Sequence, residues 1–210
     1  GYPLFRGKDR AMYRTRILFQ PIATVAIRMT ADPYKAHQFV KELVPEGRYL
    51  YDFIVSKQGV CLDLVSPCMP NLAPLKPFKE VLAKEPSSRE STALPAVGAT
   101  FRFKLRATPS RHLPNTKVRV GIVGEGEQIA WLRRQGARLG FTIAPGQVVA
   151  DDQGLISFSK SRDDRPIRYV DCHYTGYLTV TDPQAFRTAM ADGVGRGKAF
   201  GFGMLRLGAA

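Results

Sequence analysis

The chain has 210 residues, 44% of them apolar, and Lys and Arg outnumber Asp and Glu by 31 to 18, which gives a net charge of +13. This length and composition allow a sizeable buried core and exclude a disordered chain. The basic excess favours a polyanionic partner, with nucleic acid first and a membrane surface second, but the sequence has no apolar run near 18 residues and no secretory signal.

The first half of the chain predicts strand, helix, strand, strand. Apolar, β-rich runs indicate strands over 13–23, 48–56 and 60–66. The short turn Lys57-Gln58-Gly59 joins the last two as a hairpin. A helix is expected over 31–44, because Asp32 suits an N-cap and Pro33 the first helical position. The stretch 71–98 is rich in Pro, Ser and charge, which predicts a linker with at most one short helix.

The second half repeats this order. Strands are expected over 99–109, 154–161, 167–181 and 202–207, and helices over 125–140 and 182–193. The second of these helices repeats the Asp-Pro opening of the first half. Two halves of βαββαβ character predict an α+β fold made of two tandem ferredoxin-like (RRM-like) domains, at 12–97 and 98–210. Residues 1–11 are expected to be an extension or a cloning remnant.

The three cysteines have no paired close spacing. Cys61, Cys68 and Cys172 therefore predict neither a disulfide framework nor a zinc site. They favour a reducing compartment, and we expect a cytoplasmic protein with no metal and no membrane partner.

Cations line one face of the strand at 99–109. Arg102, Lys104 and Arg106 alternate with Phe101, Phe103 and Leu105. Side chains two apart on a strand are separated by roughly 6.6–6.8 Å, comparable to the spacing of phosphates along a nucleic-acid strand. The pattern predicts a polyanion track, the alternative being an ordinary solvated strand face. The next segment, 109–120, is expected to be a long hairpin loop with three further candidate cations: Arg111, Lys117 and Arg119.

A glycine-rich segment, GVGRGKAFGFGMLRLG at 193–208, follows the last predicted helix. Glycines let the backbone approach a ligand, and successive N–H groups can bind an anion. Arg196 and Lys198, with Gly197 and Gly201, are candidate phosphate contacts, and the segment holds no His, Tyr or acid for proton transfer. Ala199 follows Lys198, which excludes a P-loop, and the spacing also misses the dinucleotide fingerprint. A glycine-rich β-bulge is the structural alternative.

The helix at 31–44 carries the candidate chemistry. At about 100° per residue, Tyr34, His37 and Lys41 share one face, opposite Ala36, Phe39, Val40 and Leu43. A hydroxyl, an imidazole and an ammonium together can move protons and stabilise developing charge without a metal. An incidental surface histidine on an amphipathic helix is the alternative that spacing alone favours.

Five stretches resemble the CasE family of CRISPR repeat-processing endoribonucleases, a subunit of the Cascade complex. They are MYRTRI (12–17), DPYKAH (32–37), FRFKLRATP (101–109), EGEQIAWLRRQG (125–136) and GVGRGKAFGFGMLRL (193–207). The resemblance implies two ferredoxin-like domains, binding of a repeat RNA hairpin and metal-independent, cofactor-free cleavage at the 3′ base of its stem. It assigns catalysis to Tyr34 and His37, with Lys41 as a candidate supporting residue. It also implies a CRISPR effector complex as partner.

Three hypotheses remain open from the sequence. The first is an endoribonuclease that cuts CRISPR precursor RNA and stays on its product. The second is a non-catalytic subunit that binds the RNA hairpin on the same fold. The third is a basic ferredoxin-like protein that binds proteins or metabolites and attracts RNA only through bulk charge, which the alignment of the cations on one strand face disfavours.

Overall fold

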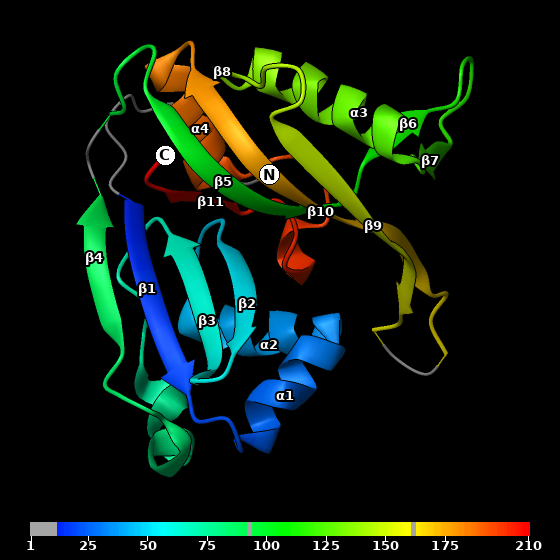
Figure 1. Ribbon diagram of the computed structural model, residues 1–210. Coiled ribbons are helices and arrows are strands. Elements are labelled where there is room, and N and C mark those ends of the chain that lie inside the picture. The colour runs from blue at the N-terminus through cyan, green and yellow to red at the C-terminus, as the bar shows by residue number, and fades with distance from the viewer. Residues whose placement is uncertain (1–11, 92–93, 161–162) are drawn as a thin grey trace.

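The computed structural model describes residues 12–91, 94–160 and 163–210. Figure 1 shows two antiparallel sheets, one above the other, each with its helices on one side. We call the sheet of β1–β4 with its helices the N-terminal domain. The sheet of β5 and β8–β11, with its helices and the separate β6–β7 hairpin, is the C-terminal domain.

The N-terminal domain has the ferredoxin-like strand order β2-β3-β1-β4. Its elements are β1 (Met12–Phe19), α1 (Thr24–Ala31), α2 (Pro33–Leu43), β2 (Leu50–Ser56), β3 (Gly59–Ser66), η1 (Ala73–Val81) and β4 (Ser87–Ser91). The 3-10 helix η1 stands where a second α-helix is usual. Its core lies between the sheet and the helices and includes Ile17, Phe19, Val40, Leu43 and Leu62.

The C-terminal domain repeats the order as β11-β5-β10 with β8 and β9 on the other edge of β10. Its elements are β5 (Thr100–Ala107), β6 (Ser110–His112), β7 (Arg119–Gly121), α3 (Glu125–Arg138), β8 (Phe141–Thr142), β9 (Val148–Phe158), β10 (Ile167–Val180), α4 (Pro183–Asp192), η2 (Lys198–Phe200) and β11 (Leu205–Gly208). The predicted tandem ferredoxin-like fold is confirmed.

The stretch 71–98 is more than a linker, and that prediction is wrong in one respect. Residues Ser87–Ser91 form β4, which pairs with β1 at the edge of the N-terminal sheet. The sequence Ser-Ser-Arg-Glu-Ser has no apolar alternation, because this edge strand buries little and is held by backbone pairing. The one short helix expected there is present as η1.

The first predicted strand is too long at its end. β1 stops at Phe19, and the run through residue 23 instead leads into α1. Pro21 has no amide hydrogen for a sheet ladder. The β-branched residues of α1 hide its helical pattern, although Ala26 and Met29 are buried three residues apart. Other boundaries differ by a few residues, and β9 begins at Val148, before the expected 154.

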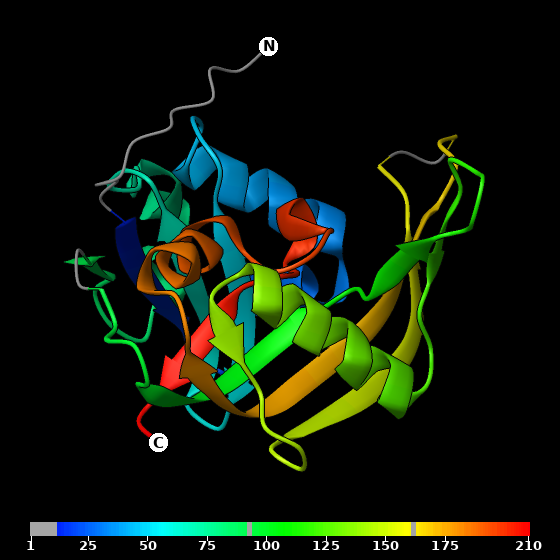
Figure 2. The same ribbon diagram turned by 90° about the horizontal axis from the view of Figure 1, so that it is seen from above.

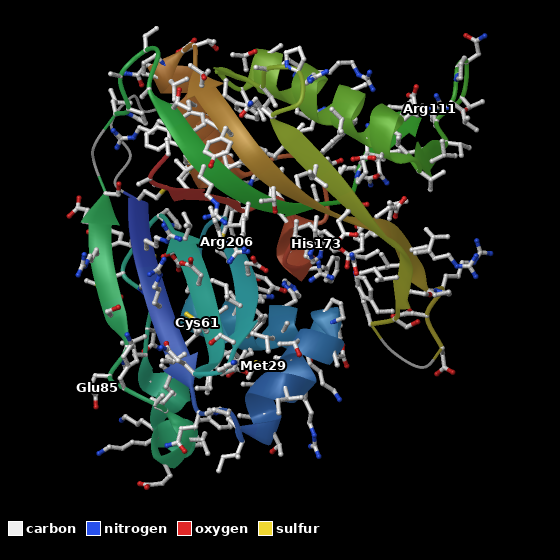
Figure 3. All side chains as sticks on the ribbon, in the orientation of Figure 1. Met29, Cys61, Glu85, Arg111, His173 and Arg206 are labelled. Atoms are coloured by element: carbon white, nitrogen blue, oxygen red, sulfur yellow. The ribbon has the colours of Figure 1, made fainter. Side chains whose placement is uncertain are left out.

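The sheet faces that carry no helices meet at the domain boundary. Leu50 and Val65 of the N-terminal domain pack with Met204 of the C-terminal domain. Beside them, Asp52 on β2 faces Arg206 on β11, with 3.0 Å between Oδ2 and Nε. Figure 3 shows Arg206 and His173 at this boundary. No helix in the described ranges is long and apolar enough to cross a membrane.

Candidate functional site

Helix α2 presents the three predicted residues as its periodicity requires. The Asp32 side chain accepts hydrogen bonds from the backbone N–H groups of Tyr34 (3.0 Å) and Lys35 (3.1 Å), so the helix begins where the sequence indicates. Ala36, Val40 and Leu43 are buried against the sheet, and the opposite face holds half-buried Tyr34 and His37 and exposed Lys41. The predicted division of faces is confirmed.

His37 lies against both domains. Its Nδ1 is 2.8 Å from the hydroxyl of Tyr49, the residue before β2. Its ring centroid is 5.6 Å from that of Phe200 in the C-terminal domain and 6.3 Å from that of Tyr34. The imidazole is therefore held in place on one side and remains half-exposed on another.

The surroundings of His37 lower its pKa. Partial burial is the largest cause, and the positive charges of Lys41 and Lys160 act in the same direction. A hydrogen bond to the backbone of Ala199 acts against them, because it favours the protonated ring. The net effect keeps the neutral imidazole, the form that can accept a proton, in excess at neutral pH.

The glycine-rich segment reaches this site. Gly197 and Gly201 have φ of 73° and 82°, and these left-handed residues bracket the single turn η2. The Tyr51 hydroxyl donates to the Ala199 carbonyl at 3.0 Å, which fixes the turn against β2. Figure 1 shows η2 in red below the upper sheet and above α2. The sequence assigns this segment phosphate binding alone, and the structure adds contact with His37.

The same segment offers backbone donors. Within the described part of the chain, the amides of residues 195–199 donate no hydrogen bond. Successive unpaired N–H groups in a glycine-rich turn suit an anion. Arg196 is exposed beside them. Lys198 is half-buried, and this burial together with nearby Arg48 lowers its pKa.

The cations on β5 are not equivalent. Arg102, Lys104 and Arg106 do share one face, and Arg102 and Lys104 are exposed. Arg106 instead forms a bidentate pair with Asp171 on β10 (Nε–Oδ1 2.9 Å, Nη2–Oδ2 2.5 Å) and lies 4.6 Å from the centre of the Phe202 ring. The sequence of β5 alone does not indicate this pairing, because Asp171 lies on the neighbouring strand β10. Of the three cations, Arg102 and Lys104 are therefore exposed, and Arg106 is half-buried and paired with an acid.

The expected hairpin at 109–120 is present. β6 pairs with β7, and Arg111, Lys117 and Arg119 are all exposed on it. Arg119 also contacts His112, with 2.5 Å between Nη2 and Nε2. The hairpin projects from the body on the same side as the far end of β9 and β10 (Figures 1 and 2), away from η2. Figure 3 shows Arg111 on this hairpin, so these cations do not gather around His37.

Sequence reasoning missed four residues of the site: Tyr49, Tyr51, Lys160 and Phe200. Phe200 packs against His37 and lies 4.7 Å from Phe158 between ring centroids. The alternating aromatics of RYLYDF at 48–53 were a usable signal, because they place Tyr49 and Tyr51 on one face. The approach of Lys160 and Phe200 depends on how the domains meet.

A cavity of about 520 Å³ opens beside the site at the domain boundary. The α1–α2 corner, including Asp32 and Pro33, forms one wall. Arg106 and Phe158 belong to the other. Its size suits a nucleotide-sized group.

The chain is similar to known CRISPR-associated proteins. The model of the family described as "CRISPR associated protein" matches residues 12–208. The "CRISPR-associated endoribonuclease Cse3" of Thermus thermophilus is 27% identical, and the match covers 92% of this chain and 98% of that protein. A structure of endoribonuclease Cse3 bound to 19-nucleotide RNA matches with a TM-score of 0.82 and 24% identity over 95% of this chain and 100% of that one.

A third match extends the comparison to an assembly. A chain of a "CRISPR RNA-guided surveillance complex" matches with a TM-score of 0.63 and 17% identity, covering 94% of this chain and 100% of that one. At these identities the two solved structures establish the shared fold alone.

Proposed function

Because the chain belongs to the family of CRISPR-associated proteins, we propose that it is an endoribonuclease that processes CRISPR repeat RNA. It binds the repeat hairpin, cleaves at the 3′ base of the stem and stays on the product as a cytoplasmic effector-complex subunit. The observation that carries the proposal is His37, held between Tyr49 and Phe200 with its pKa lowered. The endoribonuclease Cse3 relative supports the reaction class.

The reaction needs only proton transfer and charge stabilisation. Neutral His37 accepts the proton of the 2′-hydroxyl next to the scissile phosphate. The resulting oxygen forms a bond to phosphorus, and the bond from phosphorus to the 5′-oxygen breaks. The products are a 2′,3′-cyclic phosphate and a 5′-hydroxyl, once the leaving oxygen has taken up a proton. Tyr34 assists at the reacting atoms, and the Lys41 ammonium offsets negative charge on the phosphate.

We assign RNA binding to cations and backbone amides other than Tyr34, His37 and Lys41. The stem of an A-form hairpin is held mainly through its backbone and shape. Arg111, Lys117 and Arg119 on the β6–β7 hairpin, with Arg102 and Lys104 on β5, are exposed for phosphate contacts. The amides of residues 195–199 lie beside His37 and suit the phosphate nearest the cut.

The test is cleavage of repeat hairpin RNA by the full chain with excess chelator. We expect a shortened RNA that ends in a 2′,3′-cyclic phosphate. The matched substrate carries a single 2′-deoxy nucleotide at the cut and should bind but stay intact. Tight binding with no cleavage of the all-ribose hairpin would make the protein a non-catalytic hairpin-binding subunit. Cleavage that chelator abolishes would refute metal independence.

A further inference from the structure

Tyr49 is a buried phenol that faces the candidate catalytic histidine. It is 9% exposed, and its hydroxyl lies 2.8 Å from Nδ1 of His37. The two rings are close to parallel, with centroids 6.2 Å apart and 29° between their planes. A hydrogen bond to one ring nitrogen together with ring stacking restricts both the rotation and the tilt of the imidazole.

The phenol is suited to a fixed, uncharged role. Burial raises the pKa of Tyr49 to about 12, so it stays protonated near neutral pH and does not serve as a base. Its oxygen can accept a hydrogen bond from Nδ1–H. In that arrangement the neutral ring has its lone pair on Nε2, the nitrogen left for RNA.

The other groups around His37 include one competitor for the ring proton, the Ala199 carbonyl. Lys41 and Tyr34 on α2 and Lys160 beyond β9 leave Nδ1 to Tyr49. The Ala199 carbonyl, which faces the ring from η2, already accepts a hydrogen bond from Tyr51 at 3.0 Å. A carbonyl oxygen has two lone pairs, and this one also hydrogen bonds to His37, so it competes with the Tyr49 oxygen for the ring proton. The tautomer of His37 is therefore the quantity that the test must read.

We propose that Tyr49 is a positioning residue: its hydroxyl holds Nδ1–H of His37 and thereby dedicates Nε2 to the 2′-hydroxyl of the RNA. Tyr51 lies two residues after Tyr49, in β2. Its hydroxyl donates to the Ala199 carbonyl of the η2 turn, and Phe200 of that turn packs against the His37 ring. The segment that contains Tyr49 and Tyr51 thus holds both the His37 ring and the η2 turn of the C-terminal domain. The inference rests on the proposed function, since it assigns a role in that reaction.

The first arm of the test reads the proton position directly and needs no RNA. Long-range ¹⁵N–¹H spectra of the imidazoles distinguish the two neutral tautomers, and the His37 signal is identified by its loss in His37→Ala. We expect Nδ1–H in the wild type and a shift towards Nε2–H, the form favoured in water, in Tyr49→Phe. A wild-type signal of the Nε2–H form would overturn the proposal.

The second arm measures single-turnover cleavage and hairpin affinity. Tyr49→Phe keeps the packing and should slow cleavage between about 10- and 100-fold, with affinity within about two-fold, because the base is misplaced and the binding surface is intact. Tyr174→Phe is the matched control. It removes another buried hydroxyl, which donates to the Gln128 carbonyl in the C-terminal core, and should cut normally.

The outcomes separate the two claims. A wild type that binds but never cuts refutes the proposed function, and the spectra still decide the role of Tyr49. A wild type that cuts, with Tyr49→Phe cutting at the same rate, refutes the positioning role alone. Equal losses of affinity and rate in Tyr49→Phe would assign Tyr49 to RNA binding and likewise overturn the inference.

Discussion

At the scale of single residues, the charge of Lys41 lowers the pKa of His37. Burial is the main cause of the lowered pKa of His37, and Lys41 is the second. The neutral ring is the active base, so the cleavage rate should rise with pH through this pKa and level off above it. Lys41→Met removes a charge that disfavours the protonated ring. The pKa then rises, and the acid-side midpoint of the pH–rate profile should move to higher pH.

Lys35→Met is the matched control for this measurement. Lys35 is an exposed cation on the same helix that pairs with Asp32, 3.6 Å away, and it is not among the groups that shift His37. Its pH–rate profile should overlay that of the wild type. If the acid-side midpoint does not move in Lys41→Met, the rise of the cleavage rate with pH reports the titration of a group other than His37.

Arg106 differs from its neighbours because its charge is structural. Its side chain is 26% exposed and that of Asp171 only 7%. Arg106→Met should lower the free energy of unfolding by about 3 kcal/mol, since it leaves Asp171 without its bidentate partner. Lys104→Met, two residues away and exposed, should change it by less than about 0.5 kcal/mol. Urea unfolding of both variants measures the difference, and equal effects would contradict the assignment.

The same pair predicts a pH dependence. Burial alone would raise the pKa of Asp171, but hydrogen bonds from His173 and Arg106 lower it from 3.8 to about 2. The folded carboxyl therefore releases its proton more readily than the unfolded one. Its contribution to stability is present above the ordinary pKa and is lost as the pH falls towards about 2. This loss should be smaller in Arg106→Met.

At the scale of elements, the η2 turn connects RNA binding to catalysis. A Cβ on Gly201 would lie 3.2 Å from Cε2 of Tyr51, at a φ of 82° that a β-branched residue disfavours. Gly201→Val should therefore displace Ala199 and Phe200 from His37. Cleavage at saturating protein should fall by at least about 10-fold.

Gly146→Val controls for backbone strain. Gly146 has a similar φ of 73°, but a Cβ there meets nothing within 4 Å. It lies in the loop before β9, so cleavage should survive. If Gly201→Val binds RNA weakly but cuts normally when saturated, the turn only holds phosphate.

The β6–β7 hairpin should supply much of the salt dependence of binding. Replacing Arg111, Lys117 and Arg119 with Gln should flatten the plot of log affinity against log salt by about 0.7–0.9 for each phosphate that the side chains no longer neutralise. The control neutralises three exposed lysines on the far side of the N-terminal domain: Lys76, Lys79 and Lys84. Filter binding over a salt series should separate the two triple variants. Equal slopes would place the stem elsewhere.

At the scale of the whole molecule, the site is assembled from both domains. His37 and Tyr49 come from the N-terminal domain, whereas Ala199 and Phe200 come from the C-terminal one. The Leu50–Val65–Met204 cluster and the Asp52–Arg206 pair join the facing sheets beside it. Burial raises the pKa of Asp52, and the charges of Arg206 and Arg106 partly offset this rise.

Local sequence features predicted those properties of the fold and the site that depend on a single helix or strand. The Asp32 cap and the burial of Val40 and Leu43 follow from helical spacing, and with them the exposure of the Tyr34–His37–Lys41 face. The two-domain topology follows from the repeated order of strands and helices. What depends on distant segments could not be predicted. Asp171 neutralises Arg106 from a neighbouring strand, and Phe200 reaches His37 across the domain boundary.

The most direct test of the account is the single-turnover cleavage rate of repeat hairpin RNA by His37→Ala, at saturating protein and with excess chelator. Gln38→Ala, at the exposed neighbouring position of α2, is the matched control. We predict a loss of about 10²–10⁴-fold for His37→Ala, with hairpin affinity within a few-fold of wild type, and normal cleavage by Gln38→Ala. Undiminished cleavage by His37→Ala would contradict the central claim that this imidazole performs the chemistry.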